Sequence, residues 1–275
     1  MKTKFVLFIV IAIPLLVLGQ KEDIKKIQKL IDAKQPDEAL ANIYTLLEQN
    51  PSSNNLYYLK ASSEYDKNEF SKSIESINKG LMFTKANDTL MKEMLGLRAL
   101  GFSKTNDWGL AIKDAILISE LFPSDIDNLM NLSYFSGESK DYYLCIYTLQ
   151  KALKLEATNI YVLNNLAYFN NQWGDYPSGI KYSKLGLEFV KDSLWRGCLM
   201  NNLGYGLFKS GEVKSGLKFI NESLIFHPVN SYAYYNRALI YINDNNIPLA
   251  CKDLQKCKNL GGINLTTELI NKYCK

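Results

Sequence analysis

Asparagine and tyrosine recur at regular steps along the middle of the chain. The asparagines follow steps of 34, 37 and 34 residues, and a tyrosine lies three residues after each of the first three: Asn131, Asn165, Asn202 and Asn236, with Tyr134, Tyr168 and Tyr205. An asparagine amide offers both a donor and an acceptor, which suits the main chain of an extended peptide. A tyrosine ring supplies apolar contact area with a polar tip. These recurring residue types indicate a binding surface.

Residues for catalysis or metal binding are scarce. His227 is the only histidine, which argues against histidine-rich metal sites and the Ser–His or Cys–His pairs of hydrolases. The sequence has no GxGxxG after a strand and no GxxxxGK[ST] phosphate loop. The net charge is +4 without a basic stripe, which argues against nucleic-acid binding. We therefore expect no enzyme activity, no cofactor, no metal and no small-molecule substrate.

The chain repeats at intervals of about 34 residues. A small or tight residue marks the same point in seven successive units, and we number each unit so that this residue is position 20: Ala39, Ser73, Ala111, Cys145, Gly179, Gly216 and Ala250. Two apolar segments of helical spacing flank a short break in each unit. Sustained period-two segments with hairpin turns are absent. Each unit is therefore predicted to be a helix–turn–helix.

Residues 203–228 show this pattern most clearly. The stretch has Gly204 in its first helix, Gly211 at the turn, Gly216 early in the second helix and a closing Pro228. It resembles the tetratricopeptide repeat (TPR), and the resemblance extends over residues 20–275. The resemblance implies an all-α fold, a right-handed α-solenoid of about seven units over residues 20–262 with a capping helix at 263–275. The predicted repeats lie near 20–53, 54–91, 92–125, 126–159, 160–196, 197–230 and 231–262.

Two of the spacings exceed 34 residues. The extra residues fall at 84–90 and 191–197. Insertions between repeats are expected to form loops or lengthened helix ends, so the stack should continue through them.

A groove is implied by the resemblance to TPR proteins, in which first helices line a concave surface and side chains at positions 5, 6, 9 and 12 face or support it. The predicted peptide-binding residues are Asn131, Tyr134, Asn164, Asn165, Tyr168, Asn201, Asn202, Tyr205, Tyr235 and Asn236. The position-6 asparagines have two interpretations, because they can bind a ligand or only link adjacent repeats. The tyrosines favour binding. A clamp for a C-terminal carboxylate is not expected, since only Arg98 and Arg237 come near the positions that it needs.

The N-terminus has the layout of a secretory signal peptide. Lys2 and Lys4 precede an apolar run, and residues 17–20 suit cleavage before Gln20. The run is shorter than the roughly 20 residues of a membrane-spanning helix, so residues 1–19 are predicted to be a signal peptide. An uncleaved membrane anchor is the alternative. Export to the periplasm or cell envelope, or secretion, follows from this prediction, with no transmembrane span after cleavage.

The C-terminal segment is predicted to cap the solenoid. Gly261 and Gly262 stop one helix, and a last amphipathic helix follows. If the two helices pack antiparallel about this turn, Cys251 and Cys274 come level. A disulfide between them and two separate thiols both remain open. The ending is similar to that of secreted bacterial TPR proteins in which a Cys-x-Asp-Leu helix meets a final Lys-Tyr-Cys.

Two functions follow from these expectations. The first is an exported scaffold or adaptor that binds a protein or extended peptide in its groove. The alternative is a structural subunit of a secretion or surface-assembly complex in the cell envelope, which would use its outer surface. The fold by itself does not identify the partner.

Overall fold

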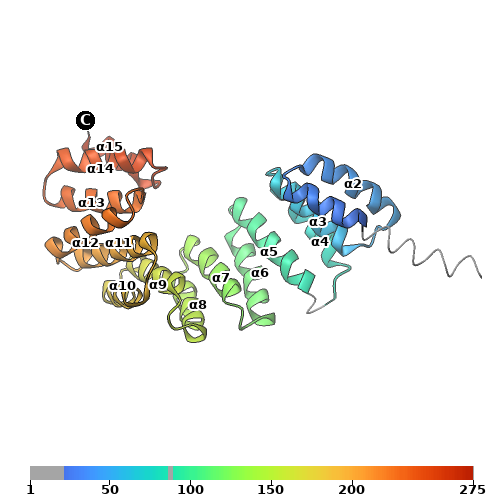
Figure 1. Cartoon of the computed structure of the whole chain (residues 1–275), viewed down its shortest axis with the longest axis horizontal. Coiled ribbons are helices and arrows are strands. Elements are labelled where there is room, and N and C mark those ends of the chain that lie inside the picture. The colour runs from blue at the N-terminus through green and yellow to red at the C-terminus, as the bar shows by residue number, and fades with distance from the viewer. Residues whose placement is uncertain (1–21, 86–88, 275) are drawn as a thin grey trace, which may run out of the picture. The chain divides into compact units, whose positions relative to one another are not determined.

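The computed structural model describes residues 22–85 and 89–274. The predicted signal peptide lies outside these ranges. Helices are the only regular elements in the described residues, which contain no strand, and this confirms the all-α prediction. The chain divides into two compact units between Asn128 and Leu129. Figure 1 shows the helices of both units, coloured in chain order.

The first unit is built from antiparallel helix pairs. A helix over residues 22–32 precedes α2; the other helices are α2 (Pro36–Gln49), α3 (Asn54–Asp66), α4 (Phe70–Leu81), α5 (Thr89–Lys104) and α6 (Trp108–Leu121). Buried Ile27, Ile43 and Leu59 form one apolar cluster, and Ala61, Ile77 and Met94 form the next. Each helix therefore buries its apolar face against its neighbours in sequence.

The second unit continues the same pattern. Helix α7 (Ile126–Glu138) crosses the division between the units, and the helices after it are α8 (Tyr142–Leu155), α9 (Ile160–Trp173), α10 (Tyr176–Phe189), α11 (Ser193–Lys209), α12 (Val213–Phe226), α13 (Ser231–Asn243), α14 (Ile247–Asn259) and α15 (Leu265–Tyr273). Helices α9 and α10, α11 and α12, and α13 and α14 pack as predicted pairs, and α15 packs on α14 as a single helix (Figure 1). The described chain is thus an α-solenoid of helix pairs.

The turn inside each pair contains one left-handed residue at the same motif position. Position 15 has a positive φ in all seven repeats: Lys34, Asn68, Asn106, Lys140, Gly174, Gly211 and Asn245. Glycine and asparagine adopt this conformation at lower cost than other residues. Lysine occupies it twice, so the packing of the two helices imposes the turn even where the residue type does not favour it.

Positions 8 and 20 bring the two helices of a pair close together. In the second repeat the Ser73 hydroxyl donates to the Ala61 carbonyl at 2.8 Å. In the sixth repeat a Cβ added to Gly216 would lie 2.7 Å from the Gly204 carbonyl oxygen. The small residues therefore have a steric cause, because a larger side chain would push the pair apart.

Both insertions precede lengthened first helices. Helix α5 has 16 residues and α11 has 17, whereas α3, α7, α9 and α13 have 13 or 14. These two helices begin at Thr89 and Ser193, before the predicted repeat boundaries at 92 and 197. These two first helices thus begin earlier within their repeats, and the paired segment stays in register.

Helix α15 covers the end of the last pair. Its Leu269 and Ile270 pack against the buried cluster that contains Tyr235, Leu254 and Cys257. Gly261 and Gly262, both with positive φ, reverse the chain before it. A disulfide joins Cys251 of α14 to Cys274, with the two Cα atoms 5.5 Å apart.

Candidate functional site

One pocket in the second unit collects most of the predicted groove residues. It has a volume of about 670 Å³ and lies among the first helices α7, α9, α11 and α13 and the turn before α15. The predicted residues that line it are Tyr134, Asn164, Asn165, Tyr168, Asn201, Asn202, Tyr205, Tyr235 and Asn236. Its volume lies within the range typical of ligand-binding clefts. Nine of the ten predicted groove residues thus share one cavity.

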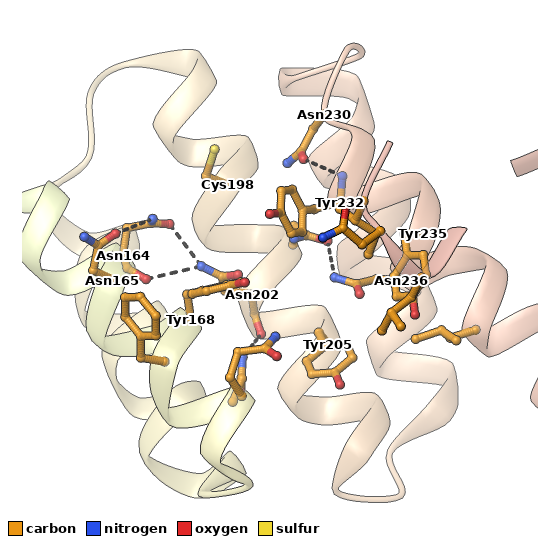
Figure 2. Close-up of a pocket in the computed structure, with 18 of the residues that line it drawn as sticks. Asn164, Asn165, Tyr168, Cys198, Asn202, Tyr205, Asn230, Tyr232, Tyr235 and Asn236 are labelled. Atoms are coloured by element: carbon orange, nitrogen blue, oxygen red, sulfur yellow. Dashed lines mark hydrogen bonds between the residues drawn. The ribbon is translucent and has the colours of Figure 1, made fainter. Parts of the chain in front are cut away.

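Asparagine pairs link neighbouring first helices along this pocket. Asn202 Nδ2 donates to Asn164 Oδ1 at 3.0 Å, and Asn236 Nδ2 donates to Asn201 Oδ1 at 3.0 Å. In both pairs position 6 of one repeat donates to position 5 of the repeat before it (Figure 2). Asn202 and Asn236 therefore do link adjacent repeats, which is one of the two roles expected for the position-6 asparagines.

The paired amides keep hydrogen-bonding capacity on the pocket side. Among the described residues, the Oδ1 atoms of Asn202 and Asn236 accept no hydrogen bond, and Asn201 Nδ2 donates none. All three amides line the pocket. An asparagine has two donor hydrogens and two acceptor lone pairs, so the links between repeats leave groups available for a ligand.

Two asparagines lie outside this ladder because the preceding repeat has no amide at position 5. For Asn165 the residue at that position is Met130, and Asn165 Oδ1 instead faces its neighbour Asn164 Nδ2 at 3.4 Å. For Asn131 it is Gly96, which has no side chain. Asn131 is exposed and does not line the pocket. Its place in the groove therefore stays a prediction.

The three position-9 tyrosines differ in their surroundings. Tyr134 is 48% exposed. The Tyr168 ring lies edge-to-face against Phe169 at 5.0 Å and against Tyr232 at 6.0 Å between centroids. Burial raises the pKa of the Tyr205 hydroxyl to about 12. The rings of Tyr168 and Tyr205 are therefore held by the fold, and only part of each faces the pocket.

Several lining residues were missed by the sequence analysis. Glu138 lies at position 13 and Tyr232 at position 2, outside positions 5, 6 and 9. Tyr232 is an aromatic residue in the first turn of α13, and its ring reaches Tyr168 on α9. The motif positions alone do not indicate this contact, because it joins two repeats that are not adjacent.

Asn171 is buried between three helices and has a structural role. Its Nδ2 donates to the Asn202 carbonyl at 2.9 Å, and its Oδ1 is buried without a hydrogen-bond partner. A Cβ on Gly179 would lie 2.1 Å from this oxygen, and one on Gly206 3.0 Å from it. The two glycines therefore make room for the Asn171 amide, which ties α9 to α11 in the wall of the pocket.

The pocket lining is almost without charge. Glu138 is the only ionisable acid or base of the Asp, Glu, Lys, Arg or His type among the described lining residues. Tyr134 and Tyr168 stay neutral at neutral pH: burial, then Glu138 and Tyr232, raises the pKa of Tyr134, and burial also raises the pKa of Tyr168. The site can thus offer hydrogen bonds, aromatic faces and one carboxylate.

A thiol and an imidazole meet at one edge of the pocket. Cys198 Sγ lies 3.6 Å from Nδ1 of His227, a Cys–His contact that the sequence analysis did not anticipate. Burial raises the pKa of the Cys198 thiol, and Asp192 adds to this effect. The thiolate required of a nucleophile is therefore disfavoured. In the described residues no group of three or more His, Cys, Asp or Glu side chains is placed to hold a metal ion.

Comparison with known proteins supports the repeat architecture. No protein-family model matches the sequence, and no curated protein matches it either. A tetratricopeptide repeat protein from Parabacteroides merdae superposes with a TM-score of 0.74 over 93% of this chain and 98% of its own, at 14% identity. The chain has the TPR fold.

Two further TPR-like structures agree with this assignment. The C-terminal part of a TPR repeat-containing protein from Cytophaga hutchinsonii gives a TM-score of 0.62 at 13% identity, over 89% of this chain and 98% of its own. A chain of the APC/C hetero-tetramer Cut9–Hcn1 gives 0.61 at 15% identity, over 90% of this chain and 48% of its own. This TPR chain therefore spans about half the length of that APC/C chain.

Membrane-spanning character is not found in the TPR helices. Within residues 22–85 and 89–274, none of the helices has both the length and the apolar composition needed to cross a bilayer.

Proposed function

We propose that this TPR protein is an exported scaffold or adaptor that binds an extended peptide segment of a protein partner in the pocket of the second unit. The observation that carries the proposal is the ladder of amides beside tyrosine rings. Asn202 and Asn236 each satisfy the link to the preceding repeat with Nδ2 and keep Oδ1 for a ligand. A peptide main chain presents donors and acceptors at regular intervals and can pair with such a row.

Aromatic rings supply the apolar part of this surface. Tyr168 is the central ring, because it lies on α9 between the lining residues of α7 and α11. Rigid aromatic side chains tend to contribute most of the binding energy at interfaces, with losses above about 2 kcal/mol on truncation. Tyr168 is braced by Phe169 and Tyr232, so little of its freedom remains to be lost on binding.

The test is loss of partner capture on removal of this ring. Partners are crosslinked in intact cell envelopes and then measured for affinity as purified pairs. Tyr168→Ala is expected to weaken binding by more than roughly thirtyfold, which corresponds to about 2 kcal/mol. The matched control is Tyr147→Ala on α8. The Tyr147 side chain is 47% exposed, its ring stacks on that of Tyr143, and it lies outside the pocket.

The opposite result would favour the structural-subunit alternative. The support for this alternative is an exposed aromatic pair on the second helix α8, where Tyr143 is 73% exposed and stacks on Tyr147. Binding that survives Tyr168→Ala but falls with Tyr147→Ala would place recognition on the outer surface and reject the pocket.

Export is the second part of the proposal and has its own test. The support is the sequence of residues 1–19 and the processing expected before Gln20. The disulfide between Cys251 and Cys274 suits an oxidising compartment. Intact-mass measurement of the protein from its native envelope is expected to show a chain that begins at Gln20. A retained Met1 would contradict cleavage and favour the anchor.

A further inference from the structure

One corner of the pocket combines aromatic faces with its only carboxylate. Tyr134 and Glu138 lie four residues apart on α7, so both project from the same face of that helix. Tyr168 of α9 and Tyr232 of α13 also line the pocket, and their rings meet at 88° with centroids 6.0 Å apart. The aromatic rings and the Glu138 carboxylate thus line the same pocket.

Within the described residues, Glu138, Tyr168 and Tyr232 have no lysine or arginine partner. Among the described residues, Glu138 forms no ion pair, and no lysine or arginine lines the pocket. Elsewhere in the unit, cations already lie over tyrosine rings: Lys151 Nζ is 4.7 Å from the Tyr147 centroid, and the Arg237 guanidinium is 5.5 Å from that of Tyr234. Within the described chain, no lysine or arginine lies over Tyr168 or Tyr232 in this way.

We propose that Glu138 and the rings of Tyr134, Tyr168 and Tyr232 form a cation subsite that takes a lysine or arginine side chain of the bound segment. The physical basis is the ring quadrupole, which attracts a cation to the aromatic face, together with a carboxylate that neutralises the charge. The subsite rests on the proposed function, because it needs a peptide in the pocket.

The electrostatic state of the corner agrees with this assignment. Glu138 contributes to the raised pKa values of both Tyr134 and Tyr168, after burial as the largest cause. A negative charge therefore acts on both hydroxyl groups. An anionic residue of a ligand would meet the same unfavourable potential, since the lining has no lysine or arginine to offset it.

Selection from a library of peptides with both ends blocked tests the subsite without a known partner. Blocking removes the terminal charges, so any charge preference comes from side chains. The bait is the full chain, in its wild-type form and as Glu138→Gln. The control is Glu188→Gln, which removes the same charge from an exposed position of α10 outside the pocket. Wild type and Glu188→Gln are expected to enrich lysine or arginine at one position, and Glu138→Gln to lose that enrichment.

Affinity measurements on one selected peptide then isolate the interaction. Replacing its lysine by norleucine, or its arginine by citrulline, removes the charge and keeps most of the length. We expect about tenfold weaker binding to wild type and little change with Glu138→Gln, because the partner charge is already absent. Tyr168→Leu should also weaken the charged peptide, whereas Tyr168→Phe keeps the ring face and should restore most of the affinity.

The possible outcomes distinguish failure of the cation subsite from failure of peptide binding itself. Enrichment of neutral or acidic residues, or a charge preference that persists in Glu138→Gln, would overturn the cation subsite and leave peptide binding in place. If wild type selects no peptide at all, the proposed peptide-binding function fails, and the subsite fails with it.

Discussion

The third and seventh repeats contain the same ion-pair arrangement but differ in their groove residues. In the seventh, Arg237 binds both carboxylate oxygens of Asp253 at 2.7 and 2.8 Å and donates to Asn221 at 2.8 Å. In the third, Arg98 binds Asp114 at 2.8 and 2.7 Å. It also donates to Asn78, in the second helix of the preceding repeat, at 2.6 Å. Equivalent positions thus form the same link in both units.

The groove positions show no such equivalence. The seventh repeat has Tyr235 and Asn236 at positions 5 and 6, and both line the pocket. The third repeat has Gly96 and Leu97 there, with Leu100 at position 9. Residues that hold helix pairs together can therefore recur while the neighbouring surface changes. The proposed binding surface lies in the second unit, whereas the Arg–Asp link occurs in both.

Replacing the arginine of this ion pair should lower the free energy of unfolding more than any other change considered. Arg237→Ala leaves the Asp253 carboxylate, 6% exposed, without its bidentate partner, and breaking such a pair costs about 3–5 kcal/mol. Arg98→Ala should cost a similar amount in the first unit, where Asp114 is also 6% exposed. Hydrogen exchange measured unit by unit reports both losses. If one substitution strongly destabilised its unit and the other did not destabilise its own, the two Arg–Asp pairs would not be equivalent.

Removal of the disulfide should cause the next largest loss of stability. The Cys251–Cys274 bridge spans 23 residues and exists only in the second unit. In the chain-entropy model a loop of this size contributes on the order of 3 kcal/mol. The Cys251→Ser, Cys274→Ser double variant is therefore expected to lower the free energy of unfolding of the second unit and leave the first unchanged. Denaturant unfolding with and without a reductant checks this. Equal curves for wild type and variant without reductant would contradict a structural role for the bridge.

Two glycine substitutions should change the free energy of unfolding by smaller amounts, with Gly216→Ala destabilising and Gly109→Ala neutral or stabilising. Gly216→Ala would place Cβ 2.7 Å from a backbone oxygen of Gly204, and such overpacking typically costs about 1–3 kcal/mol. Gly109→Ala in the first unit meets nothing within 4 Å, and is expected to be neutral or to stabilise α6 by about 0.5 kcal/mol. Thermal unfolding of the two variants compares them. A stabilising Gly216→Ala would mean that the α11–α12 crossing can widen at no cost.

The smallest effect concerns alkaline stability of the second unit. The pKa of Tyr205 is raised by burial to about 12, above the roughly 10 of an unfolded chain. The folded state therefore keeps the proton longer, and this stabilisation is complete below pH 10 and lost as the pH rises through 12. Tyr205→Phe should reduce the loss of stability between pH 10 and 12. Tyr147→Phe on the outer surface is the control, and an equal change in both variants would contradict the assignment.

The helix pairs and their register were predictable from the sequence. Small residues at position 20 recur because only a small side chain allows the two backbones to approach, as Gly204 and Gly216 show. This constraint acts within one repeat, so it leaves a local and periodic signal. The second helices begin at position 17 in the same register, for example at Val213 and Ile247.

The pocket itself depended on contacts between repeats. Whether an asparagine links helices or faces the pocket depends on the residue in the preceding repeat, which is why Asn202 finds a partner in Asn164 and Asn131 does not line the site. The contact of Tyr232 with Tyr168 joins repeats that are not adjacent. The 34-residue period describes each repeat and its immediate neighbour. The curvature that brings α13 to α9 results from small rotations between successive repeats. The sequence period does not give the size of these rotations, so the contact is seen only in the tertiary structure.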